Sequence, residues 1–367
     1  MKKKVKKFVI AVLFAIMAVI ILSVLAVVIA RFINSNQNKI NTENGIQESD
    51  YIDINGIKQY IQIRGEDTEN PIMIFIHGGP ASPTGYVSAY YQKDLEAELT
   101  IINYDQRGCG RTYYANNLDG NANIELLVED LNGIVEYAKE RFNKEKVIIA
   151  GHSWGTVIGS IYAQKYPENV SCYIGVSQIT SLYENKLNAA RMAIKEAEMK
   201  DAKAADKLSE LVERMSSVSK YEDMSIDDLN QLVSLTAKYI ACDGEMSGIR
   251  QIWTGITSPD MNIDDIKWFL SMIDTEKFFA QNKDIMEYAF FGFDIYDLSL
   301  TYDVPVYYIS SEGDYAVCQN DVQNYYESIE APGKAFYLLE NVGHTMFMDN
   351  PKLYCESIKT ILSRIEE

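Results

Sequence analysis

The sequence predicts an α/β fold: a mostly parallel sheet with helices on both faces, a helical cap inserted into it, and one apolar helix before it. Three observations lead to this expectation. Short apolar runs alternate with segments of helical periodicity from residue 51 onward. A long charged segment at about 182–293 contains no convincing strand. Residues 8–30 form an unbroken apolar run in which Ser23 is the only hydroxylated residue.

The predicted strands are short runs of apolar or alternating residues. They fall at 51–54, 57–63, 72–76, 101–104, 147–150, 173–176, 304–309 and 335–339. Helical spacing is clearest at 124–142, where apolar residues repeat every three to four positions along one face. A last helix is expected at 351–365, because proline is favoured at a first helical position. Strands that alternate with helices in this way are typical of a parallel sheet covered on both sides.

The apolar run at 8–30 is long enough for a transmembrane helix, because about 1.5 Å per residue carries it across a hydrocarbon layer of roughly 30 Å. Lysines cluster before it and no acidic residue precedes Glu43. We therefore expect a single-pass anchor in the cell membrane, with residues 1–7 cytoplasmic and the rest of the chain extracellular. A cleaved signal peptide is the alternative, although such peptides have apolar stretches of only about 7 to 15 residues. The segment 31–48 is expected to be a solvated tether.

The rest of the chain is expected to form one domain with a lid, in which the core comprises 49–181 and 294–367 and the cap 182–293. With 47% hydrophobic residues, the chain can bury a sizeable core. The formal net charge of −18, with an entirely basic N-terminus, leaves the domain strongly acidic. Such a surface repels nucleic acid and favours neutral or cationic small substrates. The five widely spaced cysteines lack a CxxC pair and are expected to be small buried residues.

The segment Gly151-His152-Ser153-Trp154-Gly155 matches the GxSxG nucleophile elbow of α/β-hydrolases. It lies between the predicted strand 147–150 and a helical run at 156–166, which is the context that the motif requires. Glycine is needed at both ends, since a side chain at either position would crowd the neighbouring backbone at this sharp turn. Ser153 is therefore the predicted nucleophile.

A serine hydroxyl needs an adjacent base, and the chain has three histidines. His77 begins the HGGP segment, and His152 is expected to face away from Ser153, so His344 is the predicted base by exclusion. It follows the last predicted strand, which agrees with the order serine, acid, histidine of this fold. Asp314, just after the strand 304–309, is the preferred acid. Glu312 and Asp303 are the alternatives, although Asp303 precedes its strand.

The oxyanion formed on attack needs backbone N–H donors, and losing one typically costs about 2.7 to 4 kcal/mol of barrier. The amide of Trp154, which follows the nucleophile, is one predicted donor. The other belongs to the HGGP segment after the strand 72–76, where Gly78 and Gly79 let the backbone approach substrate closely. No phosphate loop, dinucleotide fingerprint or metal-ligand cluster is found, so we expect neither a cofactor nor a metal.

Three strings together resemble the proline iminopeptidase group of α/β-hydrolases: HGGP at 77–80, DQRGCGR at 105–111 and GHSWGT at 151–156. The resemblance covers the core from about 51 to 178 and from 304 onward, and it implies a serine peptidase that removes an N-terminal residue from short peptides. It also makes Arg107 and Arg111 structural residues that pair with nearby carboxylates. Ala81, Thr112 and His152 depart from the family pattern.

The cap departs further, because Trp253 and Trp268 are isolated and the family's Trp- and Glu-bearing segment for the substrate's amino group is missing. Acidic cap residues that could bind an ammonium are Glu184, Glu196, Glu198 and Glu245. The expected function is hydrolysis of small peptides or amides through an acyl-enzyme. Carboxylic ester hydrolysis with the same triad, and a catalytically silent extracellular binding domain, remain the alternatives. The cap is expected to control substrate size.

Overall fold

The computed structural model describes residues 2–116 and 122–365. An eight-stranded sheet forms the centre, in the order β1-β2-β4-β3-β5-β6-β7-β8. Its strands are β1 Ile46–Ile54, β2 Ile57–Gly65, β3 Ile72–Ile76, β4 Thr100–Tyr104, β5 Val147–His152, β6 Val170–Val176, β7 Val306–Ser311 and β8 Lys334–Leu339. β1 and β2 pair antiparallel with each other, and β2 pairs antiparallel with β4. All remaining pairs are parallel, so the predicted mostly parallel sheet is confirmed.

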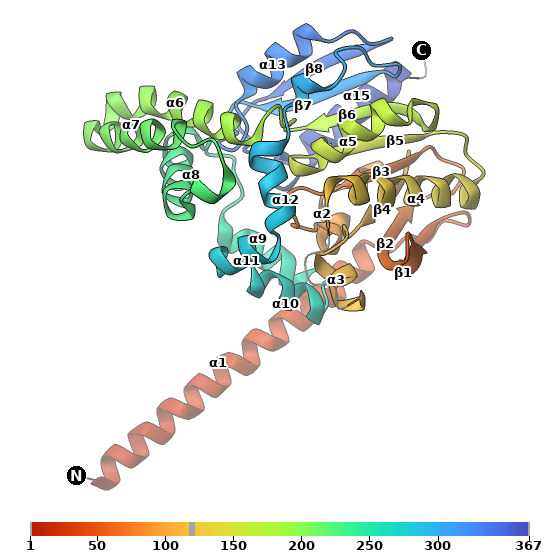
Figure 1. Cartoon of the computed structure of the whole chain (residues 1–367). Helices are drawn as coiled ribbons and strands as arrows, with labels where there is room; N and C mark the ends of the chain where they lie inside the picture. The colour runs from red at the N-terminus through yellow and green to blue at the C-terminus, as the bar shows by residue number, and fades with distance from the viewer. Residues whose placement is uncertain (1, 117–121, 366–367) are drawn as a thin grey trace.

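Helices cover both faces of the sheet (Figure 1). The core helices are α2 Ser88–Tyr91, α3 Gly110–Asn116, α4 Ile124–Phe142, α5 Trp154–Lys165, α13 Gln319–Ser328, α14 Met346–Asp349 and α15 Pro351–Ile365. Along β3 the buried side chains alternate between two hydrophobic cores. Ile74 packs in the core that includes α4 and α5, whereas Phe75 packs in the core with α14 and α15. Burial on both faces explains why the central strands are almost entirely apolar.

The insertion between β6 and β7 is wholly helical, as its charged sequence predicts. Its helices are α6 Leu182–Lys200, α7 Ala202–Ser216, α8 Ile226–Ile240, α9 Gly248–Thr257, α10 Ile263–Ser271, α11 Thr275–Gln281 and α12 Lys283–Glu287. Helices α6, α7 and α8 pack together as an arm that projects from the core, whereas α9 and α10 lie below the core, next to α1 and α3 (Figure 1). The insertion therefore has two parts, here called the arm (α6–α8) and the inner cap (α9–α12).

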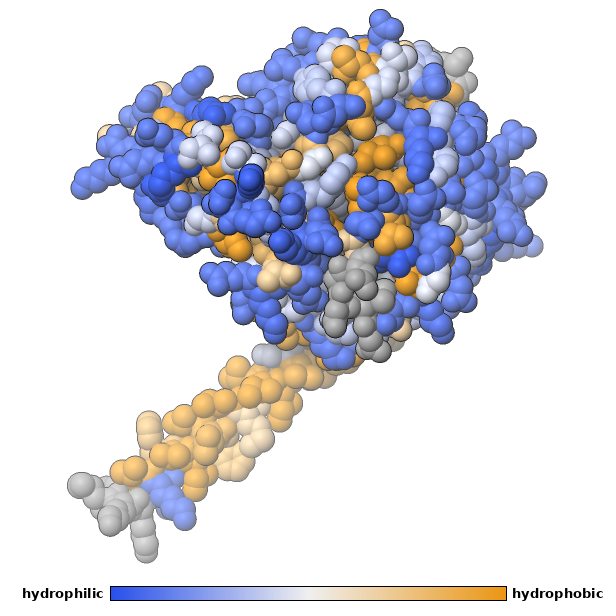
Figure 2. Space-filling view, viewed as in Figure 1, coloured by the Kyte–Doolittle hydropathy of each residue, from blue (hydrophilic) through white to orange (hydrophobic). Residues whose placement is uncertain are grey.

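Helix α1 Lys2–Gln37 stands out from the domain as an apolar rod (Figures 1 and 2). Its candidate membrane span is Val5–Gln37, within which an 18-residue stretch has a mean hydropathy of 3.3. By length and composition this helix could be either a membrane span or a signal sequence. The expected free tether is partly different in the structure, because Arg31 and Asn34 hydrogen-bond to the cap carbonyls of Pro259 and Thr257, at 3.1 and 2.9 Å. Helix α1 is thus fastened to the inner cap at its C-terminal end.

Candidate active site

The loops after β3, β5, β7 and β8 meet at the carboxyl edge of the sheet, and each contributes part of one site. Ser153 follows β5 directly and has φ 50° and ψ −120°, outside the regions that L-residues prefer. Such a backbone defines the nucleophile elbow. A side chain at Gly151 would meet the carbonyl oxygen of Gly155 at 2.5 Å, and one at Gly155 would overlap the carbonyl of Ile76. Both glycines are therefore required by the turn.

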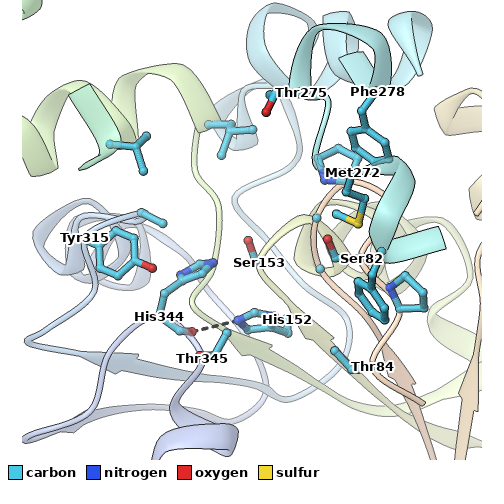
Figure 3. Close-up of a pocket in the computed structure, with 18 of the residues that line it drawn as sticks. Ser82, Thr84, His152, Ser153, Met272, Thr275, Phe278, Tyr315, His344 and Thr345 are labelled. Atoms are coloured by element: carbon cyan, nitrogen blue, oxygen red, sulfur yellow. Dashed lines mark hydrogen bonds between the residues drawn. The ribbon is translucent and has the colours of Figure 1, made fainter. Parts of the chain in front are cut away.

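His344 and Asp314 meet although 30 residues separate them. His344 Nδ1 lies 2.9 Å from Oδ1 and 3.0 Å from Oδ2 of Asp314. With Nδ1–H donating to this carboxylate, Nε2 is left free to accept a proton. The imidazole of His344 and the hydroxyl of Ser153 both line the same pocket (Figure 3). The three residues predicted from sequence are thus brought to one place.

Asp314 is buried and still stabilised as a carboxylate. Burial opposes its ionisation, but His344 and several hydrogen-bond donors outweigh burial and lower the pKa of the Asp314 carboxyl below its ordinary value. Among these donors are the amides of Ala316 and Val317, each 2.9 Å from Oδ1. The two alternative acids, Glu312 and Asp303, are exposed. Asp314 is therefore the acid that the geometry supports.

The other two histidines are unsuited to act as the base. Burial lowers the pKa of His77 to about 4, and its Nε2 accepts the amide N–H of Gln106 at 3.2 Å. Burial and the nearby His344 lower the pKa of His152 to about 3. His152 Nε2 lies 2.9 Å from the carbonyl oxygen of His344 (Figure 3). As expected, His152 faces this backbone and not Ser153; it supports the loop that carries the predicted base.

The predicted oxyanion donors surround Ser153. Trp154 is the first residue of α5, so its N–H belongs to the helical turn whose amides have no partner within the helix. Gly78 approaches so closely that a Cβ there would lie 3.1 Å from Cβ of Ser153 and 2.9 Å from Nδ1 of His152. Gly79 has φ 126°, which favours glycine. Both glycines line the pocket beside Ser153.

The two arginines of the DQRGCGR string form buried ion pairs, as the resemblance implies. Arg107 binds Asp130 of α4 through Nε and Nη2, at 2.7 and 2.8 Å. Arg111 binds Asp265 of α10, at 2.9 and 2.6 Å, and thereby joins the core to the inner cap. Trp268 of the same helix donates its indole N–H to the carbonyl of Ala81, 2.9 Å away, next to the HGGP segment. Sequence analysis missed this role of α10, because 154 residues separate Arg111 from Asp265.

The pocket has a volume of about 620 Å³ and lies between the core and the cap. Apolar side chains dominate its cap wall, among them Val233, Phe269, Met272, Phe278 and Phe290. Sequence analysis also missed two polar lining residues, Lys186 and Tyr315. Lys186 was one of many charged residues on a predicted cap helix, and only the fold shows that Tyr315, next to Asp314, lines the pocket. The described residues contain no group of three or more His, Cys, Asp and Glu side chains that could hold a metal ion.

A nucleophile elbow at the carboxyl edge of such a sheet agrees with the comparison with known families, in which the profile of the alpha/beta hydrolase fold matches residues 71–351. The chain belongs to the α/β-hydrolase family. Among similar proteins, this α/β-hydrolase is 27% identical over 308 residues to the "Probable aminopeptidase YbaC" of Bacillus subtilis, covering 84% of this chain and 93% of that protein. It is 31% identical to a proline iminopeptidase of Clostridioides difficile, over 136 residues that cover 36% of this chain and 43% of that enzyme.

Solved structures extend the likeness to the whole fold. A proline iminopeptidase of Mycobacterium smegmatis has a TM-score of 0.62 and 16% identity, covering 87% of this chain and 98% of that one. A membrane phospholipase A has a TM-score of 0.59 and 12% identity, covering all of both chains. At these identities the likeness shows a shared fold. The family assignment and the peptidase names of the relatives agree with the resemblance predicted from sequence.

Proposed function

We propose that this α/β-hydrolase is a serine hydrolase that cleaves small peptides or amides through an acyl-enzyme on Ser153. The observation that carries the proposal is that Ser153 and His344 line one pocket, while Asp314 binds His344 from behind it. His344 takes the proton of Ser153 as the hydroxyl attacks the carbonyl carbon, and then gives it to the leaving amine. Water hydrolyses the resulting ester, with His344 again as base. The amides of Trp154 and the HGGP segment stabilise the oxyanion.

A fluorophosphonate probe tests the nucleophile. We expect the full-length protein to be labelled in detergent solution, the adduct to map to Ser153, and Ser153→Ala to remove the label. Ser357→Ala, which changes a buried serine of α15 away from the pocket, is the matched control and should still be labelled. Labelling that survives in Ser153→Ala would remove Ser153 from this role. A wild type that is never labelled would favour the silent binding domain.

Aminopeptidase specificity is the finer part of the proposal, and the names of the relatives support it. Such an enzyme needs a carboxylate for the free ammonium of the substrate. Among the four acidic cap residues considered, Glu245 is the best placed, because it hydrogen-bonds to Tyr315, which lines the pocket. Burial raises the pKa of Glu245. We expect Glu245→Gln to raise KM for aminoacyl-naphthylamides and to leave KM for nitrophenyl esters unchanged.

Ester hydrolysis is the second candidate, and the apolar cap wall of the pocket favours it. An apolar wall suits an uncharged acyl chain better than an ammonium. A panel of aminoacyl-naphthylamides and nitrophenyl acyl esters decides between the two. Faster turnover of the naphthylamides supports the peptidase, whereas turnover of esters alone would replace it with the esterase.

We also propose that α1 is retained as a membrane anchor. The length and apolar character of the helix support this proposal, and so does the lysine cluster before it. The hydrogen bonds from Arg31 and Asn34 to the cap add to it, because they give the end of α1 a structural place in the folded domain.

A further inference from the structure

The pocket contains one side chain with a full charge outside the proposed triad, Lys186 of α6. The other described lining residues are apolar, hydroxylated, amide, glycine or histidine side chains, without any aspartate or glutamate. Within the described chain, Lys186 has no salt bridge. Asp314 is the charged group that acts on the pKa of Lys186, and it already binds His344 and two backbone amides.

An ammonium in this position costs free energy. Burial lowers the pKa of Lys186, and Asp314 only partly opposes this effect. Lys186 is half-buried at the pocket wall. A charge that is partly withdrawn from water without a bound partner is destabilising, and a ligand of opposite charge relieves the cost. Lys186 therefore fits a binding role better than a structural one.

We propose that Lys186 binds an anionic group of the substrate, such as a carboxylate, while the acyl group of the substrate reacts with Ser153. The inference rests on the proposed serine hydrolase function. It agrees with a dipeptide substrate, whose carboxylate would bind Lys186 and whose ammonium would bind Glu245, and equally with a hemiester of a dicarboxylic acid. The net charge of −18 predicts the opposite, since it repels anions. A preference for anionic substrates would therefore have to come from a positive charge inside the pocket, such as that of Lys186.

Two substrate pairs test this inference on the full-length protein in a neutral detergent. The first pair, mono(4-nitrophenyl) adipate and 4-nitrophenyl hexanoate, differs by an anion on the acyl side. The second pair, alanyl-leucine and its C-terminal amide, differs by an anion on the leaving side. In at least one pair we expect kcat/KM to be about tenfold or more higher for the anionic member, because hydrogen bonds to charged groups are the stronger kind.

The variants then assign the preference. Lys186→Met should bring the ratio within the preferring pair close to one, and Lys186→Arg should retain most of it. Lys195→Met, an exposed lysine of the same helix, is the matched control and should leave both rates unchanged. A wild type without a preference in either pair, or a preference that survives Lys186→Met, overturns the inference. Fluorophosphonate labelling of Ser153 in the same samples separates this failure from failure of the proposed hydrolase.

A second, independent observation concerns the outer surface of the inner cap. Seven large apolar residues are exposed on α9, on α10 and just beyond α10: Ile249, Ile252, Trp253, Ile263, Ile266, Leu270 and Ile273. We call this surface the cap face. Its exposed fractions reach 84% at Ile249 and 75% at Ile273, which no folded core explains. Outside α1 and the cap face, the exposed large hydrophobic residues of the described chain are Tyr51, Met199, Tyr296, Leu300 and Leu338.

The cap face consists of helical stripes that point outward. On α9, residues 249, 252 and 253 have the spacing of one apolar face, and on α10 residues 263, 266 and 270 do the same. An amphipathic helix normally turns this stripe to the core. The inward side of α10 is already packed against the core and the pocket, because Trp268 is buried and Phe269 lines the active-site pocket. Helix α10 is thus apolar toward both the pocket and the outside.

The cap face lies where α1 joins the domain. Arg31 hydrogen-bonds to the carbonyls of Pro259 and Met261, in the loop between α9 and α10, and α1 packs against α9. In Figure 1, helices α9 and α10 lie beside the end of α1 that joins the domain. Any bilayer crossed by α1 therefore reaches its surface next to these helices.

We infer that the cap face rests on the surface of the bilayer that holds α1, with its isoleucines and Trp253 among the lipid headgroups and upper acyl chains. This inference depends on the proposed membrane anchor. Outward apolar stripes and an amphipathic Trp are the features of helices that lie in a membrane interface. Because the other side of α10 lines the pocket, the active site would open close to the lipid.

A fluorescent label tests the cap face in phosphatidylcholine vesicles that contain the full-length protein. We expect an NBD group attached through Ile252→Cys to be quenched by lipids with a nitroxide on the acyl chain. The same group attached through Met199→Cys, an equally exposed position on the arm, should not be quenched. Both variants carry Cys242→Ser, which removes the one native cysteine that is only partly buried.

Protein that floats with the vesicles but shows no quenching at position 252 overturns the inference and leaves the anchor intact. Disulfide crosslinking between two chains at position 252, without quenching, would place a second copy on the cap face instead. Protein that does not float with the vesicles would remove the anchor proposal itself.

Discussion

Single residues of the site show how burial and hydrogen bonding set protonation. Asp314 has a lowered pKa despite its burial, because His344 and backbone amides favour the carboxylate. Its folded pKa lies below the ordinary 3.8, so its contribution to stability is complete above that pH and is lost as the pH falls through the lowered value. Ionised Asp314 thus remains available to orient His344 throughout the neutral range.

Replacing this carboxylate tests its role. Asp314→Asn should leave the fold in place but reduce kcat by about 10⁴, because an amide no longer selects the His344 tautomer or stabilises the imidazolium. Steady-state kinetics on the best substrate of the panel provides the measurement. Glu312→Gln, two residues away and exposed, is the control and should have no effect. Equal losses in both variants would count against Asp314 as the acid.

Asp105 has the opposite shift. Burial and Asp265 raise the pKa of Asp105 to about 7, although Arg111 opposes them. The folded state then holds this proton more tightly than the unfolded chain, so stability from Asp105 decreases as the pH rises from about 4 to about 7. Asp105→Asn should remove this decrease in the free energy of unfolding, which amounts to roughly 1.4 kcal/mol for each unit by which the pKa of Asp105 is raised. Thermal unfolding of both proteins between about pH 5 and about pH 8 measures it; parallel curves would contradict the shift.

At the scale of elements, regular patterns were predictable and contacts distant in sequence were not. The helices at 124–142 and 351–365 have the predicted bounds, because each keeps one apolar face and has a clear end signal. β1 begins at Ile46, five residues earlier than expected, since the polar stretch before Tyr51 lies on an exposed edge strand. The residues of the proposed triad were predictable because each lies in a loop that follows a strand. The pocket position of Lys186 and the Arg111–Asp265 ion pair could not be predicted, because only the folded cap brings these residues to the core.

The inner cap should select substrate size through α10 and the segment that follows it. Met272 lines the pocket, whereas Leu270 faces outward with 61% exposure. Met272→Ala should raise kcat/KM for a bulky acyl group relative to a short one, by about tenfold, because pocket methylenes are worth roughly 1 to 3 kcal/mol. Leu270→Ala should leave this ratio unchanged. The same ratio in wild type and Met272→Ala would show that the cap does not contact the acyl group.

The whole molecule is an α/β-hydrolase domain joined to a long apolar helix, α1, which we propose to be a membrane anchor. The sequence alone predicts that α1 is a long apolar helix, because its length, its composition and the lysines before it are properties of one continuous segment. The attachment of α1 to the cap could not be predicted from sequence, because the polar residues near position 34 are equally compatible with a solvated tether. Only the fold reveals carbonyl acceptors at Pro259 and Thr257.

Cell fractionation tests the anchor. The protein should remain with the membranes after high-salt washing, and protease added to intact cells should digest the hydrolase domain, because the lysine cluster retains the N-terminus in the cytoplasm. N-terminal sequencing of the recovered protein is the measurement. A shortened, freely soluble form that begins near Arg31 would establish a cleaved signal peptide.

The joint between Arg111 and α10 has a mechanical consequence for how substrate enters. Opening the inner cap would separate a buried ion pair and pull the Trp268 indole away from Ala81, so any such movement would also disturb the loop that is proposed to hold the oxyanion. Among the described residues, the arm has no hydrogen bond to the HGGP segment; its helix α6 is held to α13 instead, where Asn185 and Asn188 donate to the carboxylate of Asp321. A movement of the inner cap is therefore coupled to the proposed oxyanion loop, whereas a movement of the arm is coupled to α13.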